Sequence, residues 1–503
     1  MKNTAPLLLL SALLVGSTLV AQSKGLEMPG LFSDRMVLQQ GRPVKVWGRD
    51  KPGTHVVVRF GDQAKKGKAR LDGSWSVMLD SLKPGAAREL TIQGSSEKVI
   101  RDVLVGEVWF CSGQSNMEMP LQRSGQAKAA LATADQDQIR LFKTARLSAK
   151  ETGFDVEGGP WTKATPETAK GFSAVAWYFG RELHEQLQVP IGLVQCAWGG
   201  TRIQSWMSPE PLADKCFKEL VRKWQQQDQR AAVWKKAHDK WKVKAEKAKR
   251  NGKPVPKEPR KVDTANARHR PGGLFHGMAG PLLPYTWAGV IWYQGEANLK
   301  EANHYAQYMR MLVRDWRRFS QQDLPFYWVQ LASFTYRNAT EHQLPLLWEA
   351  QDQARDLPHT GMASAVDIGN PKNIHPTNKS EVGRRLSLLA LADVYGRKVE
   401  SRGPKLETWK QEGKETRLTL SHCDGGLRAT GPLSSSEVAD SHQKFFPAEA
   451  RIEGNTIVLT CPAVKTVKAI RYAFKALGPF PVHNIQGLPM PPFRTDTWPI
   501  QGQ

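Results

Sequence analysis

The pattern of apolar and polar positions changes along the chain, and the first folded region that it indicates is made of short strands. Residues 24–100 contain short apolar runs, such as 44–48, 56–62 and 73–77, at a spacing of about ten residues and without a long helical period. Short strands separated by turns at this spacing are typical of a small β-sandwich. We therefore predict an N-terminal β-sandwich-like domain over residues 24–100.

Between residues 101 and 400, apolar strand-like runs alternate with helical periods. The runs predict strands at residues 103–110, 191–197, 287–293 and 326–331. Apolar positions at helical spacing predict helices over residues 172–187, 305–316 and 382–390. Strands that alternate with helices indicate a three-layer α/β fold, in which helices cover both faces of a parallel sheet. Such a sheet binds ligands at the carboxyl ends of its strands.

Two segments depart from this alternation. Residues 215–262 are rich in Gln, Lys and Ala and contain Trp224, Trp234 and Trp241, which indicates a basic helical insertion that the turn residues at 251–256 end. From residue 401 to 503 the chain is again strand-like and rich in Pro and Gly. This composition predicts a C-terminal β-rich region.

The N-terminus has the features of a secretory signal. Lys2 is followed by an apolar run over residues 6–20 and by the small-residue sequence at 21–23, which resembles a cleavage site. The run is shorter than the roughly 20 apolar residues of a membrane span, and no later stretch is longer. We expect residues 1–23 to be removed. The mature chain would then start near Lys24, contain no transmembrane segment and be periplasmic or extracellular.

The strong positive charge does not by itself indicate a nucleic-acid-binding protein. Lys and Arg number 71 against 48 Asp and Glu, which gives a net charge of +23. About half of this charge lies between residues 215 and 261, where 17 basic residues face 5 acidic ones. A charge confined to one insertion is more typical of a solvated face than of a basic domain. We therefore expect no nucleic-acid partner.

The five cysteines indicate neither a metal site nor a redox motif. No Cys-x-x-Cys sequence occurs, the His-Glu-x-x-His spacing is absent, and we expect no metal and no other cofactor. Cys111 and Cys196 end apolar runs, where buried thiols are expected. Cys423 and Cys461 lie in one β-rich region and could form a disulfide.

Four polar clusters follow strand-like runs, at residues 110–117, 197–206, 293–298 and 367–376. They bring a serine, a pair of glycines, an asparagine and a histidine to plausible strand ends. A serine can act as a nucleophile when a histidine takes its proton, and glycine N–H groups or an asparagine amide can hold the resulting oxyanion. Each cluster also has a purely structural interpretation: a Ser-Gly turn, a tight strand-to-helix turn, an Asx-type cap and a structural histidine.

Taken together and in this order, the clusters resemble the motifs of the sialate O-acetylesterase family, within the SGNH hydrolase superfamily. The similar stretches are GEVWFCSGQSNM at 106–117, GGT at 199–201, QGEAN at 294–298, IHP at 374–376, and GLP and PFRTD at 487–489 and 492–496. The resemblance extends from about residue 25 to residue 500, with residues 215–262 as an insertion. It implies an SGNH-hydrolase-like fold and an esterase that removes O-acetyl groups from sialic acids.

The resemblance also implies roles for individual residues. Ser115 corresponds to the nucleophile and His375 to the general base. The oxyanion would be held by the N–H of Ser115, an N–H of Gly199 or Gly200, and the side chain of Asn298. The substrate-binding group further includes, from the same motifs, Gln114 and Gln294. Arg202, beside the glycine turn, is a candidate fork for the sialic acid carboxylate, and a structural salt bridge is the alternative.

The third member of the triad is open. The superfamily usually places an Asp three residues before the catalytic His, and here that position is Lys372. Asp367 is the first candidate and Glu296 the second. A Ser–His dyad, in which a backbone carbonyl orients His375, is the third possibility.

Two other functions compete with an enzyme that acts on O-acetylated sialic acid or sialoglycans. The same site could serve an acetylesterase for another acetylated glycan, such as xylan. A secreted glycan-binding protein, whose β domains and tryptophans hold sugar without cleaving it, is the alternative from another class.

Overall fold

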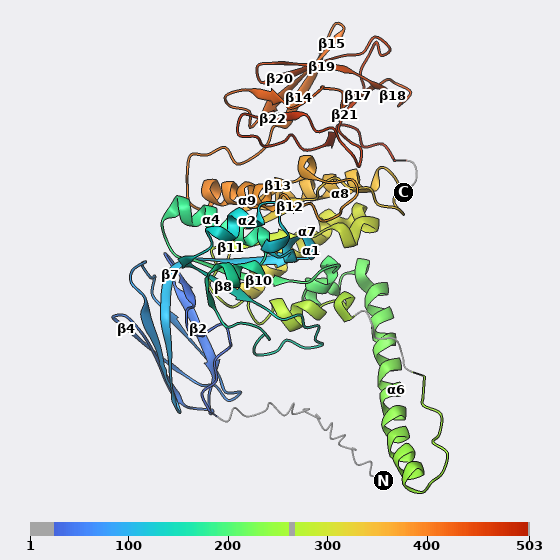
Figure 1. Cartoon of the computed structure of the whole chain (residues 1–503). Coiled ribbons are helices and arrows are strands. Elements are labelled where there is room, and N and C mark those ends of the chain that lie inside the picture. Colours follow the sequence, from blue (N-terminus) through green and yellow to red (C-terminus); the bar gives the residue numbers. More distant parts are fainter. Residues whose placement is uncertain (1–24, 261–266, 501–503) are drawn as a thin grey trace, which may run out of the picture.

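The computed structural model describes residues 25–260 and 267–500. The predicted signal segment, residues 1–23, lies outside the described residues, as does Lys24. Figure 1 shows an N-terminal β region, a central α/β body and a C-terminal β region, with one long helix projecting from the body. The predicted combination of an α/β core with β-rich regions on either side is confirmed.

A largely parallel sheet forms the centre of the body. Its strands, in spatial order, are β13 (Thr360–Ser364), β12 (Phe326–Gln330), β11 (Gly289–Tyr293), β7 (Glu97–Gly113), β10 (Ile191–Ala197), β8 (Gln136–Lys143) and β9 (Thr162–Ala164). Neighbours pair in parallel from β13 to β8, and β9 is antiparallel to β8. All residues of β10, β11 and β12 are buried, as expected for parallel strands that are covered on both faces.

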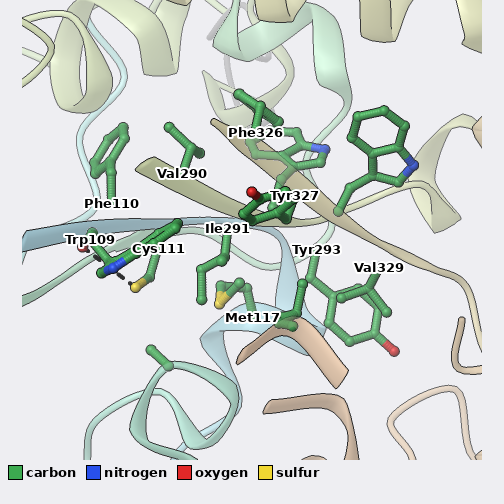
Figure 2. Packing of buried hydrophobic residues seen from close by; sticks show 14 of the residues in the cluster. Trp109, Phe110, Cys111, Met117, Val290, Ile291, Tyr293, Phe326, Tyr327 and Val329 are labelled. Atoms are coloured by element: carbon green, nitrogen blue, oxygen red, sulfur yellow. Dashed lines mark hydrogen bonds between the residues drawn. The ribbon is translucent and has the colours of Figure 1, made fainter. Parts of the chain in front are cut away.

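Helices cover this sheet from both sides. The α-helices of the described residues, in chain order, are α1 (Ser115–Glu118), α2 (Ala127–Ala132), α3 (Pro166–Lys170), α4 (Ala174–Leu187), α5 (Pro209–Leu212), α6 (Lys218–Arg250), α7 (Ala302–Ser320), α8 (Gln343–Gln353) and α9 (Lys379–Asp393), of which α6 projects from the body. Consecutive residues of a strand point to opposite faces of the sheet. On β7, Trp109 packs against Phe179 of α4 with ring centroids 4.9 Å apart, whereas Phe110 packs against Trp316 of α7 at 5.3 Å. The two helices therefore form the outer layers, and Figure 2 shows Trp109 and Phe110 on the two sides of their strand.

Strand β7 belongs to two sheets. Its first half pairs with an antiparallel neighbour in the N-terminal region, and its second half lies between β10 and β11. The remaining strands of the N-terminal region are β1 (Val37–Gln39), β2 (Val44–Arg49), β3 (His55–Phe60), β4 (Gln63–Lys68), β5 (Ser74–Leu79) and β6 (Arg88–Gln93). Strands β2 and β5 form one ribbon, and β4, β3, β6 and β7 form the second layer of strands. The N-terminal region is thus continuous with the strand that leads to Ser115.

The C-terminal region consists of antiparallel strands. They are β14 (Lys405–Glu412), β15 (Glu415–Ser421), β16 (Leu427–Ala429), β17 (Ser436–Ala439), β18 (Phe445–Pro447), β19 (Glu449–Glu453), β20 (Thr456–Thr460), β21 (Ala469–Tyr472), β22 (Val482–Asn484) and β23 (Phe493–Arg494). Strands β14, β15, β20 and β19 form one sheet, and β18, β17, β21 and β23 form another.

The disulfide considered between Cys423 and Cys461 is not formed, because both thiols are free. The register explains this result. Strand β20 pairs antiparallel with β15 so that Thr460 lies opposite Glu415, at the start of β15. Cys461 therefore lies at one end of β15 and Cys423 beyond the other. A strand rises about 3.4 Å per residue, so this separation far exceeds the roughly 7 Å that a disulfide spans between Cα atoms. Cys111 and Cys196 are buried, free thiols.

The basic insertion is built around the single long helix α6, which projects from the body (Figure 1). The chain returns along the helix after residue 251, and the indole N–H groups of Trp234 and Trp241 donate to the carbonyls of Pro259 and Pro256, at 3.1 and 2.7 Å. Two of the three tryptophans of the insertion thus hold the returning segment against the helix. Across the described residues, no helix is both long and apolar enough to span a membrane.

Candidate active site

Ser115 stands at the point where the central strand of the sheet ends. Strand β7 ends at Gly113, Gln114 has an extended backbone, and Ser115 opens the short helix α1. The N–H groups of Met117 and Glu118 both donate to the carbonyl of Gln114, at 3.0 and 2.9 Å. The N–H of Ser115 precedes these bonds and donates to no described residue. This turn therefore presents a hydroxyl and a free backbone donor side by side.

His375 reaches Ser115 from the loop between β13 and α9. Its Nε2 lies 2.8 Å from Oγ of Ser115, although the two residues are 260 positions apart in the chain. Burial lowers the pKa of His375, and the positive charges of Lys379 and Arg123 lower it further. The imidazole is therefore neutral near pH 7 and can accept a proton from the hydroxyl. The structure thus brings together the two residues that the sequence motifs single out as nucleophile and base.

Asp367 does not contact His375, which corrects its proposed place as third member of a triad. Its two carboxylate oxygens pair with Arg385 at 2.6 and 2.8 Å, and one of them lies 3.3 Å from Nε2 of His483. Burial raises the pKa of Asp367, but the hydrogen bonds from Arg385 and His483 outweigh this effect and bring the pKa to about 2. Asp367 is thus a buried ion-pair partner of helix α9.

Glu296, the second candidate acid, also forms no hydrogen bond with His375. Its Oε1 accepts a hydrogen bond from Nδ2 of Asn116 at 2.5 Å, and its Oε2 is buried without a partner among the described residues. Burial raises the pKa of Glu296. Neither acid orients His375, and no described group is hydrogen-bonded to its Nδ1. The arrangement present is a Ser–His dyad.

The two glycines of the turn after β10 differ in the state of their N–H groups. The N–H of Gly199 donates to Oε2 of Glu118 at 2.9 Å, so it is already used. The N–H of Gly200 donates to no described residue, and its φ of +71° suits glycine. A Cβ placed on Gly199 would lie 3.2 Å from Cβ of Ser115, which shows how closely this turn approaches the serine. Gly200 therefore retains the donor that Gly199 lacks.

Asn298 has both amide hydrogens committed to neighbouring side chains. Its Nδ2 donates to Gln204 at 2.9 Å and to Glu301 at 2.5 Å. Its Oδ1 accepts from the N–H of Ile203 and from Nε2 of Gln294, at 3.0 and 2.8 Å. The expected role of Asn298 as an oxyanion donor does not fit this geometry, because the side chain holds the turn after β10 in place.

The two glutamines of the motifs are buried beneath the same turns. Gln294 donates to the carbonyl of Thr201 at 3.0 Å, and the hydroxyl of Tyr305 donates to its Oε1 at 2.7 Å. The Oε1 of Gln114 lies 3.4 Å from the N–H groups of Gly295 and Ala297. Both glutamines therefore join the loops around the serine and do not line the open cleft.

A cleft of about 570 Å³ opens directly over Ser115 and His375. Its walls carry three cationic side chains, Arg123, Lys143 and Arg146. Arg146 pairs with Glu118 at 2.6 Å, and Nζ of Lys143 donates to the carbonyl of Gly171 at 2.8 Å. Arg123 forms no ion pair with a described residue and is exposed. The cleft therefore offers a free guanidinium beside the reactive pair.

Sequence reasoning missed these cations and chose Arg202 instead. Arg202 lines a separate cavity and forms an ion pair with Glu301 at 3.7 Å. This is the structural salt bridge that the sequence analysis gave as the alternative to a role in binding the substrate carboxylate. Lys143 ends β8, and Arg146 follows it by three residues. Because ligands bind at the carboxyl ends of parallel strands, recognising β8 as a strand would have drawn attention to both.

In the described part of the chain, no group of three or more His, Cys, Asp or Glu side chains could hold a metal ion.

Comparisons with known proteins find that the chain is similar to carbohydrate acetylesterases. A family model described as carbohydrate esterase, sialic acid-specific acetylesterase, matches residues 105–245 and 278–391. The chain is 31% identical to the sialate O-acetylesterase of Mus musculus over 93% of this chain and 94% of that protein. It is 29% identical to the human sialate O-acetylesterase over 93% and 92% of the two chains. A solved carbohydrate acetylesterase from Xanthomonas citri has a TM-score of 0.79 and 33% identity, over 94% of this chain and 100% of that one.

The position of Asp367 generates a prediction about stability. Asp367→Asn leaves the buried Arg385 with less compensating charge, and we expect the free energy of unfolding to fall by about 3 kcal/mol while kcat of the folded protein is kept. Since the pKa of Asp367 is lowered to about 2, the difference from the natural chain is full above about pH 4 and shrinks as the pH falls towards 2.

Denaturant unfolding and esterase kinetics on the same samples measure this change. Asp80→Asn is the matched control, because it breaks the solvent-exposed pair with Lys65 and should change stability little. A large fall of kcat in Asp367→Asn without a loss of stability would return Asp367 to the catalytic group.

Proposed function

The chain belongs to the sialic acid-specific acetylesterase family of carbohydrate esterases, and we propose that it hydrolyses the O-acetyl esters of sialic acids, with Ser115 as nucleophile and His375 as general base. The observation that carries the proposal is the 2.8 Å contact between Oγ of Ser115 and Nε2 of His375, on the floor of the cationic cleft.

The reaction follows from this contact. Oγ of Ser115 attacks the acetyl carbonyl carbon while Nε2 of His375 takes its proton. The negative charge that develops on the carbonyl oxygen is stabilised by backbone donors. The N–H groups of Ser115 and Gly200 can serve, because neither donates to another described residue. The tetrahedral intermediate then collapses, and the sugar hydroxyl leaves with the proton from Nε2. Water, activated by the same imidazole, cleaves the acetyl-serine and releases acetate.

A sialic acid differs from most acetylated sugars by its carboxylate, and the cleft provides a counter-charge for it. Arg123 is free of ion pairs within the described residues and acts on His375 electrostatically, so its charge is close to the reacting atoms. A guanidinium binds a carboxylate through two parallel hydrogen bonds. The acetylated xylose units of a xylan have no anionic group for this arginine, which is why we prefer the sialic acid ester.

Two observations favour catalysis over sugar binding without cleavage. Ten tryptophans are buried, among them Trp109, Trp292 and Trp316, and these cannot serve as exposed platforms for a sugar ring. A Ser–His pair at hydrogen-bonding distance has a use in ester hydrolysis and none in simple binding.

The first test concerns the mechanism. Ser115→Ala and His375→Ala should each lower acetate release from O-acetylated sialic acid at least about a thousandfold, because the nucleophile and its base act as a unit. Enzymatic measurement of released acetate follows the reaction, and a fluorophosphonate probe should label the natural chain at Ser115. Full activity in either variant would rule out the mechanism, and an unlabelled serine would favour a binding protein.

The second test concerns the substrate. Arg123→Gln should raise KM for O-acetylated sialic acid about tenfold, which corresponds to the loss of one charged hydrogen bond, and leave KM for p-nitrophenyl acetate unchanged. Arg202→Gln, on the separate cavity, is the comparison and should leave both values as they are. Faster hydrolysis of acetylated xylan than of acetylated sialic acid would select the other glycan as substrate.

We also propose that the chain is exported, because residues 1–23 have the composition of a cleavable signal. Sequencing the N-terminus of the protein isolated from its natural host should find a start near Lys24. A chain that retains Met1 would contradict export by cleavage.

A further inference from the structure

One amide connects the two loops that carry Ser115 and His375. Asn116 directly follows Ser115, and its Nδ2 donates to the backbone carbonyl of Ile374 at 3.0 Å. Ile374 directly precedes His375. The side chain next to the nucleophile is therefore bonded to the peptide group next to the base.

The peptide group between Ile374 and His375 is held at both of its polar atoms. Its carbonyl accepts from Asn116, and its N–H donates to Oδ1 of Asn373 at 2.9 Å. This matters because no described group is hydrogen-bonded to Nδ1 of His375. In a full triad a carboxylate on that nitrogen orients the ring. Here the orientation of the ring has to come from the backbone to which it is attached.

Charges on both sides determine which way the amide of Asn116 faces. Lys379 donates from Nζ to its Oδ1, and Oε1 of Glu296 accepts from its Nδ2, both at 2.5 Å. A reversed amide would point its NH₂ group at an ammonium and its oxygen at a carboxylate. The two charges therefore direct Nδ2 towards the carbonyl of Ile374.

The three residues come from different elements, and two of them, Lys379 and Asn116, lie in the interior, whereas Glu296 is half-buried. Lys379 opens α9, Asn116 lies on α1, and Glu296 follows β11. Lys379 has no exposed surface, Asn116 is 1% exposed, and Nζ of Lys379 lies 5.0 Å from the ring centroid of Tyr293. Burial lowers the pKa of Lys379 to about 7, with Glu296 opposing the effect. Removing such charges from water costs free energy, so the cluster by itself lowers the stability of the fold.

We propose that Asn116 is a positioning residue, which holds the Ile374 carbonyl and thereby keeps the imidazole of His375 within reach of Ser115, while Lys379 and Glu296 fix the direction of its amide. This inference rests on the proposed function, because it concerns the geometry of the same Ser–His pair. It explains what Glu296 does in place of a triad acid.

The test exchanges an acid and an amide inside the cluster. In Asn116→Asp, one carboxylate oxygen keeps Lys379, and the other faces both Glu296 and the Ile374 carbonyl, which are acceptors. We expect a lower melting temperature and a kcat for p-nitrophenyl acetate that falls about a hundredfold, with KM unchanged. In the double variant Asn116→Asp with Glu296→Gln, the new amide at 296 donates to the new carboxylate, and the net charge of the cluster is restored.

The double variant separates positioning from stability. We expect its melting temperature to return close to that of the natural chain while kcat stays about a hundredfold low, because the Ile374 carbonyl still faces an acceptor. Recovery of kcat together with melting temperature would overturn the proposal, and so would a natural kcat in Asn116→Asp. The double variant decides the question even if the single variant does not fold.

Two controls complete the experiment. Asn484→Asp replaces another buried asparagine whose Nδ2 donates to two carbonyls, those of Arg402 and His422, in the C-terminal region. It should lower the melting temperature and leave kcat unchanged. Ser115→Ala separates the two levels of the argument: activity that does not depend on Ser115 means that the proposed function fails, whereas Ser115-dependent activity that survives Asn116→Asp means that only the positioning role fails.

Discussion

The close approach of two backbones at Gly113 and Tyr293 is the constraint on which the site depends. Gly113 has a φ of +142°, and a Cβ there would lie 2.2 Å from the carbonyl oxygen of Tyr293. Only glycine lets β7 stay paired with β11 to its last residue, and the N–H of Gln114 then extends the contact by donating to the same carbonyl at 2.9 Å. Ser115 follows at once, so its position is set by the central strand of the sheet.

The same parallel sheet explains why residues from distant parts of the chain meet. The turns after β7, β10, β11 and β13 all leave the sheet at its carboxyl edge, where the serine, the glycine pair, Glu296 and the histidine loop converge. Two acidic residues lie at this edge, and the charge of each is balanced by a buried cation of α9. Asp367 balances Arg385, and Glu296 faces Lys379 across Asn116. Helix α9 thus supports the histidine loop through two charges.

The sequence predicts most of the sheet and the proximity of Ser115 and His375, and it fails where a strand begins with polar residues or where an ion pair decides where a side chain points. The strand over residues 191–197 has the predicted bounds, because every position in it is buried and the apolar run is uninterrupted. Strand β8 was missed because only its second half is mainly buried, and its polar start hides the run. The assignment of Asp367 failed for another reason. Its distance from His375 in sequence is short, but nothing in the sequence shows that Arg385, 18 positions away, turns back on helix α9 to take both oxygens.

The cationic cleft has two opposing effects on the proposed chemistry, and the charge of the substrate decides between them. Burial and the charges of Lys379 and Arg123 lower the pKa of His375, which keeps the imidazole neutral and also makes it a weaker base. A carboxylate that pairs with Arg123 cancels the part of this effect that comes from Arg123, so it returns some basicity to Nε2 when the ester is in place. A neutral glycan leaves this effect unchanged. An anionic substrate would therefore gain both binding and a stronger base from one arginine, whereas an uncharged ester would meet the weaker base that the empty cleft contains.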